Sequence, residues 1–191
     1  MAETIRLLGM SGSLRKDSFN TALLHAAQEL APAGMTVEIA DLSAMPLYND
    51  DVREKGYPAP AQALREGIRR ADAVLIATPE YNYSIPGVLK NAIDWASRPP
   101  EQPFDGKVVA IMGASPGRIG TARAQYHLRQ CFVFLNSIVL NRPEVMVGGA
   151  AQVFKDGKLT DAPTRQFVSD LLTALSQAVA RQRVLARSPA S

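Results

Sequence analysis

The sequence has few of the residues that build metal sites, catalytic triads and disulfide frameworks. Among 191 residues it contains one cysteine, Cys131, and two histidines, His25 and His127. One cysteine excludes a disulfide within the chain, and its apolar helical surroundings predict a buried, unreactive thiol. Because neither histidine has cysteines or acidic residues at ligand spacing, we expect neither a metal site nor a Ser-His-Asp triad.

Long apolar runs are also missing, and the excess of positive charge is small. No stretch reaches the length of a membrane span, and the N-terminus lacks the pattern of a signal peptide. We therefore expect a cytoplasmic protein with no membrane partner. The net charge of +3 is spread over predicted helix surfaces and a C-terminal tail without interleaved aromatic residues. This pattern favours a solvated helix end over a nucleic-acid site.

What the sequence does contain is a regular alternation of short β-branched runs and amphipathic segments. The predicted strands are 5–9, 37–39, 73–77, 108–112 and 138–140, and the predicted helices are 18–30, 61–70, 86–96, 121–135 and 164–185. Such alternation predicts right-handed crossovers and a parallel sheet covered on both faces. We expect one α/β domain over residues 1–187 and a flexible tail at 188–191.

A small-residue loop, Gly9–Asn20, joins the first predicted strand to the first helix. Glycines let the backbone bend, and the first N–H groups of a helix have no partner within it, so such a loop suits an anion. The side chains that would hold a phosphate are Ser11, Ser13, Arg15, Ser18 and Asn20. The glycine spacing fits neither a Walker A loop nor the dinucleotide fingerprint, which favours a terminal monophosphate. The alternative is that Ser18 or Asp17 only caps the helix and Arg15 is solvated.

Two further loops follow the third and fourth predicted strands. Thr78–Gly87 displays two tyrosines, against which a flat heteroaromatic ring can lie. The alternative is that the tyrosines pack at a subunit interface and Glu80 caps the next helix. Gly113–Gly120 is a second small-residue loop that can approach the ring or a second nucleotide, or else a surface turn in which Ser115 is a local cap. In doubly wound sheets these loops lie at one edge, so we expect all three to converge.

Three motifs resemble the NADPH-dependent FMN reductase family, in its quinone and chromate reductase branch. They are Gly12–Asn20, Pro79–Trp95 and Gly113–Gly117, of which the second is long and highly specific. The resemblance implies a flavodoxin-like three-layer sandwich, with a five-stranded parallel sheet of order 2-1-3-4-5 between two helical layers. It also implies noncovalently bound FMN, with NADPH or NADH as co-substrate.

The resemblance also assigns residues by position. It implies a phosphate loop, an isoalloxazine loop and a third contact, with no metal and no catalytic side chain, because the flavin N5 carries the hydride. Arg123, Tyr126 and Glu144 resemble contact positions of a homodimer or homotetramer. The expected cofactor-binding residues are Ser11, Ser13, Arg15, Ser18, Phe19, Asn20, Pro79, Glu80, Tyr81, Asn82, Tyr83, Ser115 and Gly117.

The implied activity is hydride transfer from NAD(P)H to FMN and then to a small acceptor such as a quinone, chromate, an azo compound or a nitro compound. Arg118 is placed to meet the 2′-phosphate of NADPH. One alternative is a flavodoxin-type electron carrier, which the basic net charge disfavours. Another is an NAD-dependent dehydrogenase in which Asp41 holds a ribose hydroxyl, which the missing glycine fingerprint disfavours.

Overall fold

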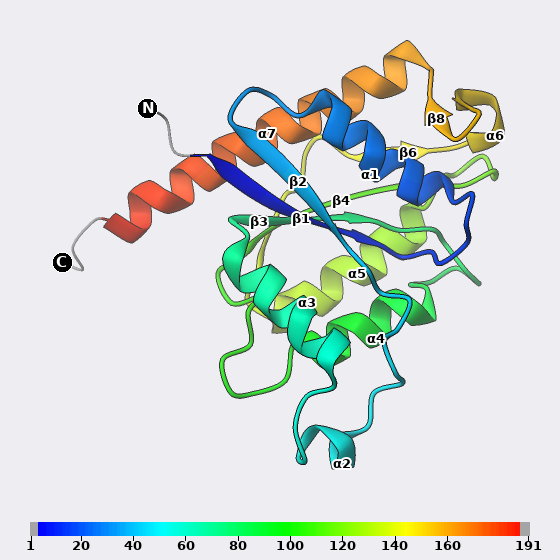
Figure 1. Ribbon diagram of the computed structural model, residues 1–191. Helices are drawn as coiled ribbons and strands as arrows, with labels where there is room; N and C mark the ends of the chain where they lie inside the picture. Colours follow the sequence, from blue (N-terminus) through cyan, green and yellow to red (C-terminus); the bar gives the residue numbers. More distant parts are fainter. Residues whose placement is uncertain (1–3, 188–191) are drawn as a thin grey trace.

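A parallel sheet lies at the centre of the protein, which we describe over residues 4–187 from a computed structural model (Figure 1). Its four longer strands are β1 (Ile5–Ser11), β2 (Met35–Ala40), β3 (Ala73–Ala77) and β4 (Val108–Ala114). The strand order is β2-β1-β3-β4-β5, which confirms the expected order 2-1-3-4-5. Strands β3 and β4 are buried along their whole length, as their continuous apolar runs require.

The fifth position of the sheet is divided between two short strands. Instead of one strand at 138–140, β5 (Ile138–Val139) pairs with the start of β4 and β6 (Val145–Val147) pairs with its end. Pro143 lies in the connecting segment and has no N–H to donate to a ladder, which interrupts the strand. As a result, β6 lies beside the loop that follows β4.

Helices cover both faces of the sheet and enclose two hydrophobic cores (Figure 1). Helices α1 (Phe19–Leu30) and α7 (Ala162–Arg187) cover one face; α3 (Ala59–Arg70), α4 (Gly87–Ala96) and α5 (Ala122–Phe134) cover the other. Helix α3 begins two residues earlier than predicted, because Pro60 is tolerated in a first turn. No helix within residues 4–187 is long and apolar enough to cross a membrane. The predicted tail at 188–191 lies outside the described residues.

Four short elements were not predicted, because each has too few residues to show a period. They are α2 (Asp50–Arg53), α6 (Ala150–Val153), β7 (Phe154–Lys155) and β8 (Lys158–Leu159). Helix α2 belongs to the excursion 41–58, whose Pro46 carbonyl accepts hydrogen bonds from Trp95 Nε1 and Asn91 Nδ2, both at 2.8 Å. At its start the Asp41 carboxylate accepts the Ser43 N–H at 2.8 Å, and hydrogen bonding from the Ser43 side chain and N–H lowers the pKa of Asp41. This aspartate therefore closes a turn in the chain that follows the second strand.

Candidate active site

Three loops meet at the carboxyl edge of the sheet, as expected. We call residues 12–18 loop 1, residues 78–86 loop 2 and residues 115–121 loop 3. Loops 1 and 2 touch at Gly12, because a Cβ there would lie 2.9 Å from Pro79 Cδ. Loops 2 and 3 follow the paired parallel strands β3 and β4, so they begin next to each other. A Cβ on Gly113 would lie 2.3 Å from the Thr78 carbonyl oxygen.

Asn20 joins the start of α1 to the end of β4. Its Nδ2 donates to the Ala114 carbonyl at 3.0 Å, and its Oδ1 accepts the Ala114 N–H at 2.9 Å. The side chain is buried, so both amide atoms are used to hold loops 1 and 3 together. This amide was expected to be a phosphate ligand, but the structure gives it a protein partner 94 positions away.

The serines of loop 1 and its flanks bond to the protein itself. Ser18 is the N-cap of α1, because its Oγ accepts the N–H groups of Asn20 at 3.2 Å and Thr21 at 3.4 Å, which leaves the hydroxyl hydrogen able to donate to an anion. Ser11 Oγ lies 2.8 Å from Thr21 Oγ1, and Ser13 Oγ accepts the Arg15 N–H at 3.4 Å. All three serines are buried, and their hydroxyls shape the loop.

Other donors of loop 1 have no protein partner in the part of the chain that the structure describes. The exposed Arg15 guanidinium lies 5.3 Å from the ring centroid of Phe19, which in turn packs on Phe154, and no ion pair holds it within residues 4–187. No hydrogen bond in that part of the chain uses the backbone N–H of Leu14 or Lys16. Hollows of about 460 and 340 Å³ flank Arg15. Together with the α1 N-terminus, this arrangement suits an anion.

Loop 2 contains a tight turn with two unused N–H groups. Tyr81 and Ser84 exchange backbone hydrogen bonds at 3.1 and 3.0 Å, and the residues between them have φ of 49° (Asn82) and 67° (Tyr83). These values define a type I′ turn, which non-glycine residues adopt at a cost of about 1–3 kcal/mol each. No hydrogen bond within residues 4–187 uses the Asn82 or Tyr83 N–H. The turn therefore presents two donors outward.

Glu80 caps α5, whereas the capping alternative for this residue named the next helix, α4. Its carboxylate accepts the backbone N–H groups of Arg123 at 2.9 Å and Ala124 at 3.1 Å, and Arg123 Nη1 at 3.0 Å. The N-cap residue of α5, Thr121, makes no side-chain cap bond of its own. Because the partners are 43 positions apart, no local pattern in the sequence signals this contact.

Loop 3 is held by β6 and the residues that follow it. The Ser115 N–H donates to Val147 O at 2.9 Å, and Gly117 O accepts the Gly149 N–H at 3.1 Å. Ser115 Oγ accepts the Gly117 N–H at 3.1 Å, so Ser115 is the local cap that the alternative interpretation named. The N–H groups of Arg118 and Ile119 take part in no hydrogen bond within residues 4–187. Each of the three loops thus carries unpaired backbone donors.

Metal-ligating side chains do not gather at these loops in the part of the chain that the structure describes. Within residues 4–187, no three of the His, Cys, Asp and Glu side chains form a group that could hold a metal ion. Cys131 on α5 is half-buried, less than expected, and lies near the surface pair Lys90 and Asp94. Burial raises the pKa of the Cys131 thiol, which disfavours the reactive thiolate.

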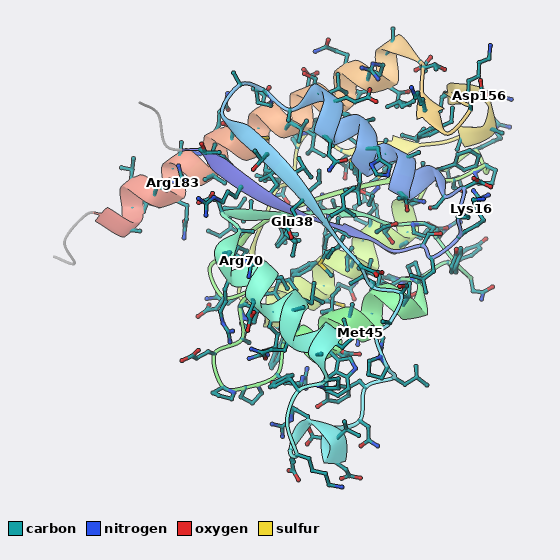
Figure 2. All side chains as sticks on the ribbon, in the orientation of Figure 1. Lys16, Glu38, Met45, Arg70, Asp156 and Arg183 are labelled. Carbon is teal, nitrogen blue, oxygen red and sulfur yellow. The ribbon has the colours of Figure 1, made fainter. Side chains whose placement is uncertain are left out.

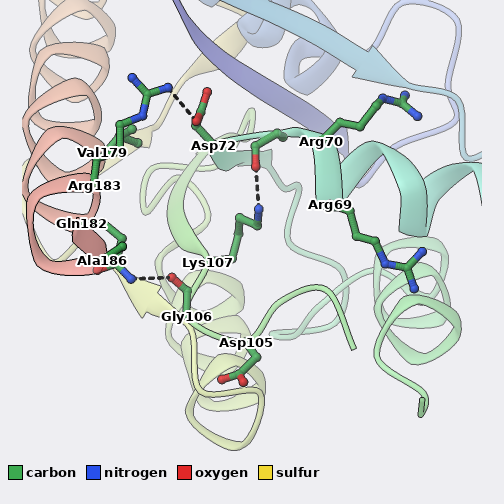
Figure 3. Close-up of a pocket in the computed structure, with 11 residues that line it drawn as sticks. Arg69, Arg70, Asp72, Asp105, Gly106, Lys107, Val179, Gln182, Arg183 and Ala186 are labelled. Carbon is green, nitrogen blue, oxygen red and sulfur yellow. Dashed lines mark hydrogen bonds and ion pairs between the residues drawn. The ribbon is translucent and has the colours of Figure 1, made fainter. Parts of the chain in front are cut away.

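A hollow of about 300 Å³ lies at the opposite, amino edge of the sheet (Figure 3). Lys107 Nζ donates to the Ala71 carbonyl at 2.5 Å, and Arg183 Nη2 donates to Asp72 at 2.7 Å. Burial lowers the pKa of Lys107. Figure 2 shows Lys16 of loop 1 and Arg183 at opposite ends of the molecule, so this hollow is separate from the three loops.

Comparison with known proteins decides which family this site belongs to. Residues 5–152 match the model of the family described as NADPH-dependent FMN reductase. This chain belongs to that family. An NAD(P)H-dependent FMN reductase of Pseudomonas aeruginosa is 57% identical over 184 residues, covering 96% of this chain and all of the relative. A quinone reductase of Escherichia coli K12 is 47% identical over 189 residues, with coverage of 96% and 100%.

A solved structure supports the same assignment. The flavoenzyme FerB of Paracoccus denitrificans, an NAD(P)H:acceptor oxidoreductase, superimposes with a TM-score of 0.86 at 36% identity, covering 94% of this chain and 99% of that one. The predicted family and the flavodoxin-like fold are confirmed. As a member of the FMN reductases the chain is an oxidoreductase and a flavoprotein, and the electron-carrier alternative is wrong.

Proposed function

We propose that this chain oxidises NADPH or NADH and passes the two electrons through bound FMN to quinones. The observation that carries the proposal is the set of unpaired N–H groups on three adjoining loops, beside the free guanidinium of Arg15. A phosphate needs several donors at one point, and a flavin ring needs donors along one edge. The names of the two relatives, an FMN reductase and a quinone reductase, agree with this chemistry.

The residues expected to bind FMN divide into those that would contact FMN and those that position them. Arg15 and the free N–H groups of loop 1 would contact the phosphate, while Asn82 and Tyr83 would donate to the ring. The other expected residues hold these donors in place: Ser11, Ser13, Ser18, Phe19, Asn20, Pro79, Glu80, Tyr81, Ser115 and Gly117. FMN, when bound, supplies the hydride chemistry. The N–H groups of loop 2 would stabilise negative charge on the ring without reorganising, because their turn is already formed.

The rim of the site supports quinones over metal oxyanions as acceptors. Each of the three loops exposes more than half of a large apolar side chain: Leu14, Tyr81 and Ile119. Exposed apolar groups gathered around a polar site mark a surface that binds apolar partners. A planar quinone buries such surface, whereas chromate gains nothing from it. We expect azo and nitro aromatic compounds to be lesser substrates.

Anaerobic titration of the purified protein tests the proposal. Apoprotein reconstituted with FMN should lose its flavin colour when NADPH or NADH is added, and a quinone should restore the colour. Steady-state rates with a naphthoquinone, chromate, an azo dye and a nitroaromatic compound then rank the acceptors, and the quinone should have the highest kcat/KM. Apoprotein that takes up no FMN would refute the function, and a preference for chromate would refute the acceptor class.

Two finer expectations belong to the same proposal. Arg118 on loop 3 would contact the 2′-phosphate of NADPH, so Arg118→Ala should reduce the preference for NADPH over NADH.

Val133 and Phe134 on α5 are 80% and 88% exposed, which supports burial of this face in a homodimer or homotetramer. Sedimentation analysis that finds only monomer would contradict the assembly.

A further inference from the structure

Loop 2 rests on the first turn of α5 through Glu80. The carboxylate is 10% exposed and accepts three hydrogen bonds, two from backbone N–H groups at the helix start and one from the guanidinium of Arg123. The N-terminus of a helix attracts negative charge, and hydrogen bonds with an ionised partner are stronger than those between neutral groups. The residue just before the turn is therefore fixed to a rigid element.

The same arginine also reaches the turn itself. The guanidinium of Arg123 lies 3.7 Å from the ring centroid of Tyr83, and one turn later His127 Nδ1 lies 3.1 Å from Ser84 Oγ. Glu80, Tyr83 and Ser84 thus all contact α5, while Tyr81 is paired with Ser84. A turn with two consecutive non-glycine residues at positive φ persists only when its surroundings hold it.

We infer that Glu80 is a positioning residue: its carboxylate, anchored on α5, keeps the turn in the form that presents the Asn82 and Tyr83 N–H groups to the flavin. This inference rests on the proposed function. The competing role is a helix cap that stabilises α5 and has no effect on the turn. If Glu80 positions the turn, its loss changes the turn and the flavin affinity as well as the global stability. If Glu80 is only a helix cap, its loss changes the global stability alone.

A second carboxylate cap in the same chain provides a matched control. Asp161 accepts the Thr164 N–H at 2.9 Å at the start of α7, and Thr164 Oγ1 also donates to it. It touches none of the three loops. Asp161→Ala therefore removes a helix cap of the same chemistry without touching loop 2, and should lower Tm while leaving the turn and FMN binding unchanged.

The experiment compares Glu80→Ala, Glu80→Gln and Asp161→Ala. In apoprotein, hydrogen exchange of the paired Tyr81 and Ser84 amides measures the turn; in a fluorescence titration, quenching of added FMN measures its Kd. Glu80→Ala should speed turn exchange and raise the Kd by about tenfold or more, because the charge-assisted bonds that fix the turn to α5 are lost. Glu80→Gln keeps an oxygen acceptor for α5 and should recover part of both effects.

The outcomes separate the inference from the proposed function. If Glu80→Ala lowers Tm as Asp161→Ala does but leaves turn exchange and the FMN Kd at wild-type values, Glu80 is only a helix cap. Should Glu80→Ala not fold, the same two measurements on Glu80→Gln decide, and wild-type values there overturn the inference. Wild-type protein that binds no FMN would instead refute the proposed function, while the exchange data would still report whether Glu80 holds the turn.

Discussion

The two edges of the sheet both carry hollows and charged side chains, but they differ in whether those groups have partners. At the amino edge, Lys107 and Arg183 donate to protein oxygen atoms, and Gln182 reaches the Gly106 carbonyl. At the carboxyl edge, Arg15 and the outward N–H groups of the three loops bond to no protein atom within residues 4–187.

This difference shows that unsatisfied donors identify the binding edge better than the size of a hollow does. The residues that carry these open donors are exposed, so water satisfies the donors until a ligand replaces it, and their gathering at one edge offers a ligand several hydrogen bonds at once. Lys107 and Arg183 hold the ends of α3 and α7 against the sheet and serve structure, whereas the exposed Arg70 makes no ion pair within residues 4–187. The four predictions below test this contrast between the two edges.

The largest expected effect comes from glycines at the two edges. A Cβ on Gly113 would lie 2.0 Å from Thr121 Oγ1 and 2.3 Å from the Thr78 carbonyl, neither of which can move freely. Gly113→Ala should therefore reduce the free energy of unfolding by about 3 kcal/mol or more. Gly106→Ala at the amino edge should cost only about 1 kcal/mol, because its strain comes from φ of +64° and its space is open. Urea denaturation measures both, and equal losses would contradict the packing of loops 2 and 3.

The next effect concerns cations at the two edges. Arg15→Gln should weaken FMN binding by roughly 10- to 100-fold, because a charge-assisted hydrogen bond contributes about 1.5–3 kcal/mol. Arg70→Gln replaces an exposed arginine of the amino-edge hollow and should leave the FMN Kd unchanged. Fluorescence titration of the apoproteins compares them. A loss with Arg70→Gln and none with Arg15→Gln would move the site to the other edge.

A smaller effect is expected from the amide that joins loops 1 and 3. Asn20→Ala leaves the buried N–H and C=O of Ala114 without their partners, which should cost about 1–3 kcal/mol of stability. Movement of the loops should also weaken FMN binding, so saturating FMN should raise the Tm of the variant by less than it raises the Tm of wild type. Thermal unfolding with and without FMN checks both points; a variant as stable as wild type would show that the bridge is unimportant.

The smallest effect belongs to Lys107. Because burial lowers the pKa of this lysine in the folded protein, the unfolded chain binds more protons between that pKa and the ordinary lysine pKa of 10.5. The contribution of Lys107 to stability should therefore rise with pH across this window. Lys107→Met removes that rise and should leave FMN binding intact. The unfolding free energies of both proteins, measured from neutral to alkaline pH, give the difference, and parallel curves would contradict the assignment.

Much of the fold was predictable, because its information is local. The apolar runs of β1, β3 and β4 and the periodicity of the five long helices identified these elements, and glycine and proline placed most of their ends. The split of the fifth strand and the four short elements were missed, since two to four residues show no period. The half-burial of Cys131 was missed for a related reason: periodicity gives a helix face but not what covers it.

The sequence by itself determined the family, the alternation of strands and helices, and which three loops carry the small, hydroxyl and aromatic residues of the site. Only the tertiary structure decided what those residues do. Asn20 and Ala114 are 94 positions apart, and Glu80 and Arg123 are 43 apart, so their hydrogen bonds exist only after the sheet has brought the loops together. Which N–H donors stay without a protein partner depends on these contacts between distant residues, and local sequence patterns do not predict such contacts.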